Sequence, residues 1–247
     1  MSGVENKSVI EIQGLSKSFG DNHVLNNFNM KLMKGQNLAV LGKSGSGKSV
    51  LIKCIIGLMR PDTGTIEVFE SNIPDLSNEQ LDKIRVRIGF LFQSNALYDS
   101  MTVRENLEFP LRRHWIEKEK RNVNELVMEA LENVGLPETV DMMPAELSGG
   151  MKKRISIART LILKPDIILY DEPTTGLDPI TAREISNLIL KVQEKYNTSS
   201  IIISHDMNCI KIVADQIIML IEGKNYVQGN YDEVKANKDE KVKQFFE

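Results

Sequence analysis

The stretch that decides the fold is NLAVLGKSGSGKSVLIKCIIGL, residues 37–58. Its pattern is that of an apolar strand, a glycine-rich loop and an apolar helix in direct succession. The loop GKSGSGKS at 42–49 satisfies GxxxxGK[ST], whose glycines let backbone N–H groups and a helix N-terminus face phosphate oxygens. A plain glycine-rich turn would leave the lysine at the helix start unexplained, because a cation there opposes the helix dipole.

The loop therefore predicts a nucleotide site. Lys48 brings a positive charge to the β- and γ-phosphates, and the Ser49 hydroxyl can ligate Mg²⁺. The residues expected to bind the nucleotide are Gly42, Lys43, Ser44, Gly45, Ser46, Gly47, Lys48 and Ser49.

Around this unit, short apolar runs alternate with longer stretches of helical period, which is typical of an α/β fold with a parallel sheet. Buried core strands are expected at 37–42, 87–93, 166–172, 200–205 and 216–223. Alternating patterns predict an antiparallel sheet from 9–15, 24–33 and 65–70.

Residues 72–164 are mostly helical in pattern. Capping boxes mark two helix starts, Ser77 with Gln80 and Thr102 with Glu105. We therefore predict one domain over residues 1–247, with the α/β core of a P-loop NTPase, an antiparallel β subdomain and a helical subdomain inserted at about 95–160.

Composition narrows the choice of partners and compartment. The chain has 247 residues, and 34 acidic against 31 basic side chains argue against nucleic acid as a partner. Cys54 and Cys209 lie in apolar surroundings, which predicts reduced, buried thiols and a cytoplasmic compartment. The N-terminus lacks the pattern of a signal peptide, and apolar runs such as 217–221 are far below the ~20 residues that cross a bilayer. Any association of this chain with a membrane would therefore be made through a partner protein.

DIILYDE at 166–172 supplies carboxylates at the end of a predicted buried strand. Asp171 is placed for the magnesium shell, and Glu172 lies where a carboxylate can polarise an attacking water. The alternative for both is a helix cap or an ion-pair partner.

LSGGMKKR at 147–154 has the features of a second phosphate-binding element. Ser148, Gly149 and Gly150 open a predicted helix, so a hydroxyl, bare backbone amides and the helix dipole suit an anion. Ser148 can also be an ordinary N-cap, and the two roles are compatible.

Five motifs in order, GKSGSGKS, LFQ, LSGGM, IILYDEPTTGLD and IIISHD, resemble the ATP-binding subunit of ABC transporters over nearly the whole chain. The resemblance implies an ATP hydrolase with ATP and Mg²⁺ as cofactors. It also implies a homodimer in which two copies stack head to tail. Each ATP would then lie between the phosphate loop of one copy and the Ser148 loop of the other.

The resemblance also implies roles for three side chains on loops. Phe19 would stack on the adenine, where the alternative is a buried core phenylalanine. Gln93 would reach Mg²⁺ and the water and sense the transmembrane subunit, unless it caps a turn. His205 would contact the γ-phosphate, whereas His23 and His114 are expected at the surface.

Asp178 resembles the family's acidic residue that crosses the dimer interface. It is equally a strong N-cap before Pro179, and both interpretations stay open. The segment after Gln93, residues 95–98, is expected either to line a groove for a helix of an integral membrane permease or to be part of a buried core. Its residues are Asn95, Ala96, Leu97 and Tyr98.

One departure points to a subgroup. Many family members have Gln where this chain has Met151, which hydrogen-bonds poorly. In this respect the chain resembles the ATPases of MCE-associated, Mla-type systems, which move phospholipids between the membranes of diderm bacteria. The resemblance is carried by Met151 together with residues 91–114, DPIT at 178–181 and the tail 239–246. Some members extend well past this point, so the end at Glu247 puts a tail-mediated grip on a neighbouring subunit in doubt.

The subgroup implies a peripheral position on the cytoplasmic face of the inner membrane and a role in outer-membrane lipid asymmetry. Its implied partners are a membrane permease and an MCE-type lipid-binding subunit. The alternatives are a small-solute importer ATPase, the division-associated ABC ATPase, and a soluble ABC protein acting on ribosomes or DNA. The soluble class usually carries two cassettes or a long coiled coil, and this chain shows one cassette and no heptad stretch.

Overall fold

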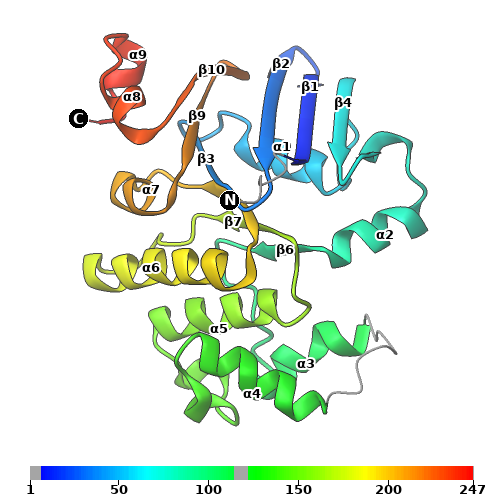
Figure 1. The fold of residues 1–247 in the computed structure, drawn as a ribbon, viewed down its shortest axis with the longest axis vertical. Coiled ribbons are helices and arrows are strands. Elements are labelled where there is room, and N and C mark those ends of the chain that lie inside the picture. The colour runs from blue at the N-terminus through cyan, green and yellow to red at the C-terminus, as the bar shows by residue number, and fades with distance from the viewer. Residues whose placement is uncertain (1–6, 114–121, 247) are drawn as a thin grey trace, which may run out of the picture.

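The computed structural model describes residues 7–113 and 122–246 (Figure 1). Its larger sheet has the strand order β10-β9-β3-β8-β7-β6. Five of these strands are parallel, and β10 pairs antiparallel with β9 at the edge. The strands are β3 (Asn37–Leu41), β6 (Ile88–Leu91), β7 (Ile167–Asp171), β8 (Ser199–Ile203), β9 (Gln216–Ile221) and β10 (Lys224–Gly229).

The five predicted core strands are confirmed, with ends shifted by one or two residues. Strand β10 was missed, because KNYVQG alternates exposed and half-buried positions and lacks the apolar run of the other five. Burial explains the continuous pattern in β3 and β8, where every residue is buried.

The smaller sheet is antiparallel, in the order β2-β1-β4-β5. Its strands are β1 (Ser8–Phe19), β2 (Asn22–Met33), β4 (Thr63–Val68) and β5 (Ser71–Asn72). Helix α1 (Lys48–Ile55) shares one apolar cluster with both sheets and buries Leu51, Ile52, Cys54 and Ile55. The predicted antiparallel sheet is therefore confirmed, and α1 fixes it against the core.

Helices cover the other face of the larger sheet (Figure 1). Between β6 and β7 the chain forms α3 (Val103–Arg113), α4 (Val123–Asn133) and α5 (Gly149–Leu161), which make the helical layer at the bottom of the view. The remaining helices are α2 (Asn78–Val86), α6 (Pro179–Tyr196), α7 (Met207–Val213), α8 (Tyr231–Lys235) and α9 (Glu240–Lys243). The predicted fold class is confirmed, while the subdomain limits of 95–160 stay a prediction.

Local signals set several helix starts. Ser77 and Gln80 form both arms of a capping box at α2. At α3, the Thr102 hydroxyl accepts from the Glu105 N–H at 3.2 Å, and Glu105 accepts from the Thr102 N–H at 2.8 Å. Both predicted capping boxes are confirmed.

Cys54 and Cys209 are free and buried, as predicted, and burial raises the pKa of each thiol to about 11. Within residues 7–113 and 122–246, no helix is both long and apolar enough to cross a bilayer. Of the two histidines expected at the surface, His23 is exposed and His114 lies outside the described residues.

The sheet order places the functional segments. Parallel strands have their carboxyl ends at one edge of the sheet, where ligands of such folds bind. The loops that leave β3, β6, β7 and β8 at this edge carry residues 42–49, Gln93, the Asp171 and Glu172 pair, and His205.

Candidate functional site

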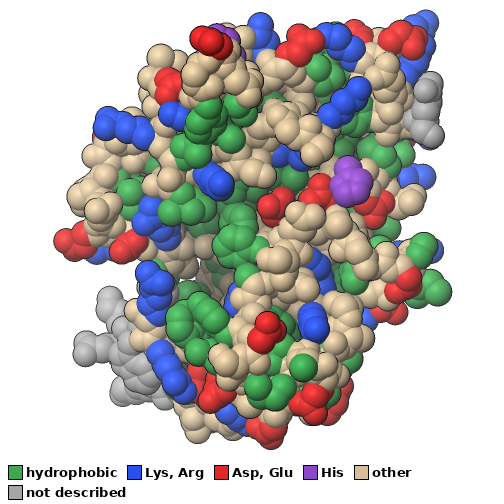
Figure 2. Space-filling model, turned by 180° about the vertical axis from the view of Figure 1, so that it is seen from behind, with side chains coloured by type: hydrophobic (Ala, Val, Ile, Leu, Met, Phe, Trp, Pro, Cys, Tyr) green, Lys and Arg blue, Asp and Glu red, His purple; other side chains and the backbone are tan. Residues whose placement is uncertain are grey.

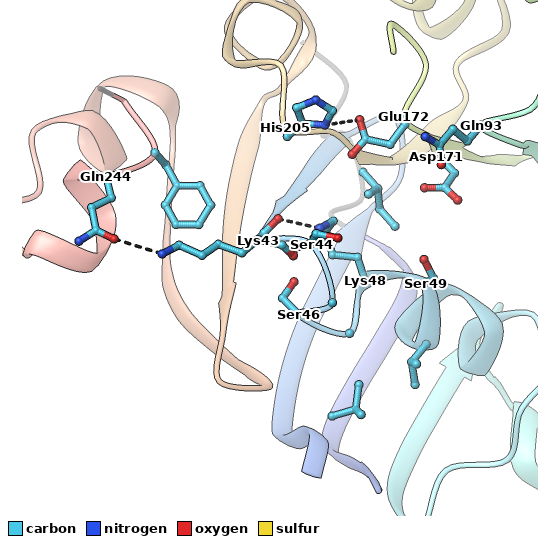
Figure 3. A pocket seen from close by; sticks show the side chains of 17 residues that line it. Lys43, Ser44, Ser46, Lys48, Ser49, Gln93, Asp171, Glu172, His205 and Gln244 are labelled. Atoms are coloured by element: carbon cyan, nitrogen blue, oxygen red, sulfur yellow. Dashed lines mark hydrogen bonds and ion pairs between the residues drawn. The ribbon is translucent and has the colours of Figure 1, made fainter. Parts of the chain in front are cut away.

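The phosphate loop of residues 42–49 wraps the N-terminus of α1 (Figure 3). Gly45 and Gly47 have φ of 76° and 103°, a region that side chains rarely adopt. A Cβ on Gly47 would lie 2.8 Å from the Val24 carbonyl oxygen. Lys48 Nζ donates to the carbonyl oxygens of Gly42 at 2.6 Å and Lys43 at 3.0 Å. The glycines are therefore required by the path of the loop.

A pocket joins this loop to the other predicted polar residues. We call it the first pocket, and its polar residues outside the loop include Gln93, Asp171, Glu172 and His205. In Figure 3 these four side chains lie opposite the loop. The structure thus brings together all the residues predicted from β3, β6, β7 and β8.

Charges in the first pocket influence one another. Burial raises the pKa of the Asp171 carboxyl, and neighbouring Glu172 raises it further, while Lys48 and Lys153 oppose the rise. Burial likewise lowers the pKa of Lys48, against the attraction of the two carboxylates. An electropositive loop therefore faces two acidic groups across one pocket.

Glu172 is held in a strained position. Its φ of 51° is in the left-handed region, and its N–H donates to the Ile203 carbonyl at 2.8 Å. The carboxylate accepts from Thr175 Oγ1 at 2.9 Å and lies 2.8 Å from His205 Nδ1. Its side chain is 12 % exposed and that of His205 is 70 % exposed, so the histidine faces the open side of the pocket.

The Ser148 element lies in a separate, second pocket. This second pocket is lined by residues 148–151 together with Leu136, Arg154, Gly176, Leu177, Asp178, Thr181 and Glu184. Ser148 caps α5 by accepting from the Met151 N–H at 3.2 Å, so its N-cap role is confirmed. A Cβ on Gly150 would lie 2.6 Å from Thr181 Cγ2. The described residues that line the two pockets do not overlap.

Asp178 is the N-cap of α6. Its Oδ1 accepts from the N–H groups of Ile180 and Thr181 at 3.0 Å each. The Thr181 hydroxyl and these backbone donors lower the pKa of its carboxyl. The N-cap interpretation is confirmed, and the interface role stays a prediction.

A family model described as "ABC transporter" matches residues 25–175. The chain belongs to the ABC transporter family. As a member it is an ATP hydrolase that uses ATP and Mg²⁺.

Two relatives and one solved structure show how far the likeness extends. The chain is 38% identical over 240 residues to the intermembrane phospholipid transport system ATP-binding protein MlaF of Haemophilus influenzae, covering 97% of this chain and 90% of the relative. It is 40% identical over 233 residues to the probable ribonucleotide transport ATP-binding protein mkl of Mycobacterium leprae, covering 94% and 67%. A dimeric structure of the ATP-binding cassette MJ0796, in a post-hydrolysis state with ADP and Pi, is 30% identical with a TM-score of 0.80, covering 90% of this chain and 98% of that one.

The chemistry of the first pocket fits the cofactors of this ABC ATPase. Ser49, Gln93 and Asp171 offer oxygen ligands, which Mg²⁺ prefers. In residues 7–113 and 122–246, no group of three or more His, Cys, Asp or Glu side chains could hold a metal. When bound, Mg²⁺ neutralises charge on the β- and γ-phosphates.

Phe19 is the one predicted site residue that lies in neither pocket. It is 49% exposed at the end of β1, so the buried-core alternative is wrong. Its stacking on adenine stays a prediction.

Sequence reasoning missed residues at the edge of the first pocket. Gln244 and Phe245, which follow α9, line it, and Lys43 Nζ donates to Gln244 Oε1 at 3.2 Å (Figure 3). The two partners are 201 positions apart, so no local pattern could have indicated the contact. Thr175, by contrast, stands in the quoted motif TTGLD and could have been recognised beside Glu172.

The segment after Gln93 is partly buried and partly exposed. Leu97 packs against the apolar cluster of the helical layer, whereas Tyr98 is 43% exposed and contacts the Phe109 ring at 4.9 Å. Phe92, which was missed, is 46% exposed. Figure 2 shows hydrophobic side chains gathered over a hollow between the helical layer and the sheets above it. The buried-core interpretation therefore holds for Leu97, and the groove for a permease helix stays a prediction.

Proposed function

We propose that two copies of this chain stack head to tail, and that each ATP lies between the phosphate loop of one copy and residues 148–150 of the other. The observation that carries the proposal is the placement of two phosphate-binding elements in two pockets that share no described residue. A hydroxyl and bare amides at the start of α5 suit a γ-phosphate that the same copy does not present to them. The dimeric MJ0796 cassette supports this arrangement by likeness.

The proposed roles follow the geometry of the first pocket. Lys48 and the loop amides bind the phosphates, and Glu172 orients the attacking water. His205, bonded to Glu172, contacts the γ-phosphate. Ser49, Gln93 and Asp171 hold Mg²⁺. Two further residues have proposed roles outside this pocket. Phe19 stacks on adenine, and Asp178 crosses the dimer interface.

Mixing two impaired variants tests the shared site. Lys48→Ala removes the cation of the first pocket, and Ser148→Asp places a negative charge in the second. In a mixed dimer both defects fall in one site and the other site is intact, so ATP-dependent dimers form and activity rises above that of either variant alone. A mixture no more active than the sum of its parts, with no ATP-dependent mixed dimer on size-exclusion chromatography, would refute the shared site.

The cargo we propose is phospholipid, moved between the membranes of a diderm bacterium by a complex that includes an integral membrane permease and an MCE-type lipid-binding subunit. The chain would bind the cytoplasmic face of the inner membrane as a peripheral subunit. Support comes from Met151 in the second pocket and from the likeness to MlaF over nearly the full length of both chains. The exposed Phe92 and Tyr98 beside Gln93 provide a surface for the permease.

A second candidate keeps the ATPase and changes the cargo to a small solute. The likeness to mkl, whose name describes ribonucleotide transport, favours it. Purification of the chain with its permease, followed by reconstitution into vesicles, separates the two. Phospholipid in the vesicles stimulates ATP hydrolysis if the first proposal holds, whereas stimulation by ribonucleotides or other solutes alone would exclude it.

A further inference from the structure

One face of α5 holds the main chain of residues 93–96. Lys153, Ser156 and Arg159 are spaced by three residues, so they lie on the same side of the helix. Each donates from its side chain to a backbone carbonyl of that segment. Lys153 Nζ donates to Gln93 O at 3.1 Å, and Arg159 Nη1 donates to Ala96 O at 2.7 Å. The single hydroxyl proton of Ser156 is shared between Asn95 O at 3.0 Å and Lys152 O of its own helix at 2.8 Å. We call these three side chains the α5 clamp.

The clamp is built into the protein interior. Lys153 is 2% exposed and Ser156 1% exposed, and their helix also buries Ile155 and Ile157. A buried ammonium is costly unless it is hydrogen-bonded, so a lysine at this position requires a specific partner. Its hydrogen-bond partner is the carbonyl of Gln93, and the nearby carboxylates of Asp171 and Glu172 also favour its charge. Directly after the clamp, the Thr160 hydroxyl lies 3.3 Å from Phe90 O of β6 and 2.9 Å from Ser156 O of its own helix.

The segment that the clamp holds has an unusual backbone. Asn95 and Ala96 have φ of 64° and 52°, two successive left-handed residues that are not glycine. Such conformations persist where the surroundings hold them. The carbonyls of these two residues are the ones that Ser156 and Arg159 bind. The path of the chain immediately after Gln93 is therefore determined by α5.

We propose that Lys153 is a positioning residue for Gln93, and that the α5 clamp sets where the Gln93 side chain lies relative to Asp171 and Glu172. This inference rests on the proposed role of Gln93 at Mg²⁺ and the water. Helix α5 would then serve both pockets. Residues 148–150 at its start line the second pocket, and Lys153, about one turn further along, binds the carbonyl of Gln93, which lines the first. A purely structural lysine would instead stabilise the fold without acting through Gln93.

The test is a double-mutant cycle on the dimer, with Lys153→Met and Gln93→Ala. A small displacement of Gln93 is expected to lower kcat about tenfold in Lys153→Met with little change in the KM for ATP. Because both changes act through one group, the double variant should lose no more than Gln93→Ala alone. Lys153→Gln keeps a donor without the charge and is expected to recover most of the loss.

Amide hydrogen exchange of the nucleotide-free protein gives a readout besides activity. Lys153→Met should speed exchange at residues 93–98 while the melting temperature changes little, and Lys152→Met serves as the matched control on the same helix. If Lys153→Met lowers the yield of folded protein, Ser156→Ala removes a neighbouring contact with a smaller change and should give the same exchange pattern.

The outcomes separate this inference from the proposed function. If Gln93→Ala lowers kcat and Lys153→Met changes neither kcat nor exchange, the positioning role is refuted and the proposed function stands. Losses that add in the double variant also refute it. If Gln93→Ala leaves kcat unchanged, the proposed role of Gln93 is wrong, and with it the catalytic effect of the clamp.

Discussion

The first and second pockets both carry a helix N-terminus suited to phosphate, yet they differ in what surrounds it. In the first, residues 42–49 face Gln93, Asp171, Glu172 and His205, so one chain supplies a lysine cation, an amide, two carboxylates and an imidazole around one pocket. In the second, Ser148 and two glycines have Met151, Asp178 and an Arg154–Glu184 ion pair beside them. This difference fits our proposal that the first pocket hydrolyses ATP and that the second clamps the nucleotide of the partner copy.

The largest effect is expected from the base of the first pocket. Glu172→Gln keeps the size of the side chain and its contact with Thr175 but cannot accept a proton from water. We expect kcat to fall by about a thousandfold, the middle of the range for a positioned general base, with ATP binding retained. Steady-state hydrolysis and equilibrium nucleotide binding measure the two parts.

Glu194→Gln is the matched control, because this exposed glutamate lies on α6 and should leave both measurements unchanged. Undiminished hydrolysis by the Glu172 variant would show that another group orients the water. The proposed role of Glu172 as the general base of the first pocket would then be wrong.

The next effect concerns the cation of the same pocket. Lys48→Ala removes a charge-assisted contact with the phosphates. Such a contact contributes at most about 3 kcal/mol to the free energy of ATP binding, so we expect ATP to bind roughly a hundredfold more weakly. Titration calorimetry of the purified variant measures it. Lys53→Ala, an exposed lysine on the same helix, should bind as tightly as the unaltered protein. Equal affinities in the two variants would contradict the role of Lys48.

The two pockets also differ in how fully the sequence predicts them. The first could be predicted because its members follow apolar strands, and parallel strands bring their carboxyl ends to one edge. Residues 148–150 could be predicted as an anion-binding helix start. Their place in a pocket separate from the phosphate loop follows from tertiary packing and was expected only through the family resemblance.

Other parts of the site depend on contacts that no local pattern contains. The approach of Gln244 to Lys43 depends on β10 returning alongside β9, and β10 has no continuous apolar run. The exposed position of Phe19 depends on the two-residue turn between β1 and β2, which points the ring away from the core. The hold of Lys153 on Gln93 joins residues 60 positions apart.

A smaller effect should distinguish the second pocket from the first. Ser148→Asp keeps an N-cap, so the protein should stay as stable as before, but its carboxylate repels the partner's phosphate. We expect hydrolysis to fall about tenfold while a single copy binds ATP normally, because Lys48 and the loop are intact. Size-exclusion chromatography with ATP and thermal unfolding measure dimerisation and stability.

Ser148→Ala gives the complementary result, since it removes the cap and is expected to lower the free energy of unfolding by about 1 kcal/mol. If Ser148→Asp weakened ATP binding by an isolated copy, the second pocket would belong to the same site as the first. The proposal that the first pocket binds ATP of its own copy and the second that of the partner would then be wrong.

The smallest effect should come from the contact that orients Glu172. Thr175→Val removes the hydroxyl that donates to the Glu172 carboxylate at 2.9 Å and keeps the shape of the side chain. His205 Nδ1 still holds the same oxygen at 2.8 Å, so kcat should fall only about threefold, as expected when one of two orienting contacts is lost. Thr198→Val is the control, because the buried Thr198 hydroxyl has no partner within the described residues. A fall as large as that of Glu172→Gln would mean that Thr175, and not His205, determines where the carboxylate lies.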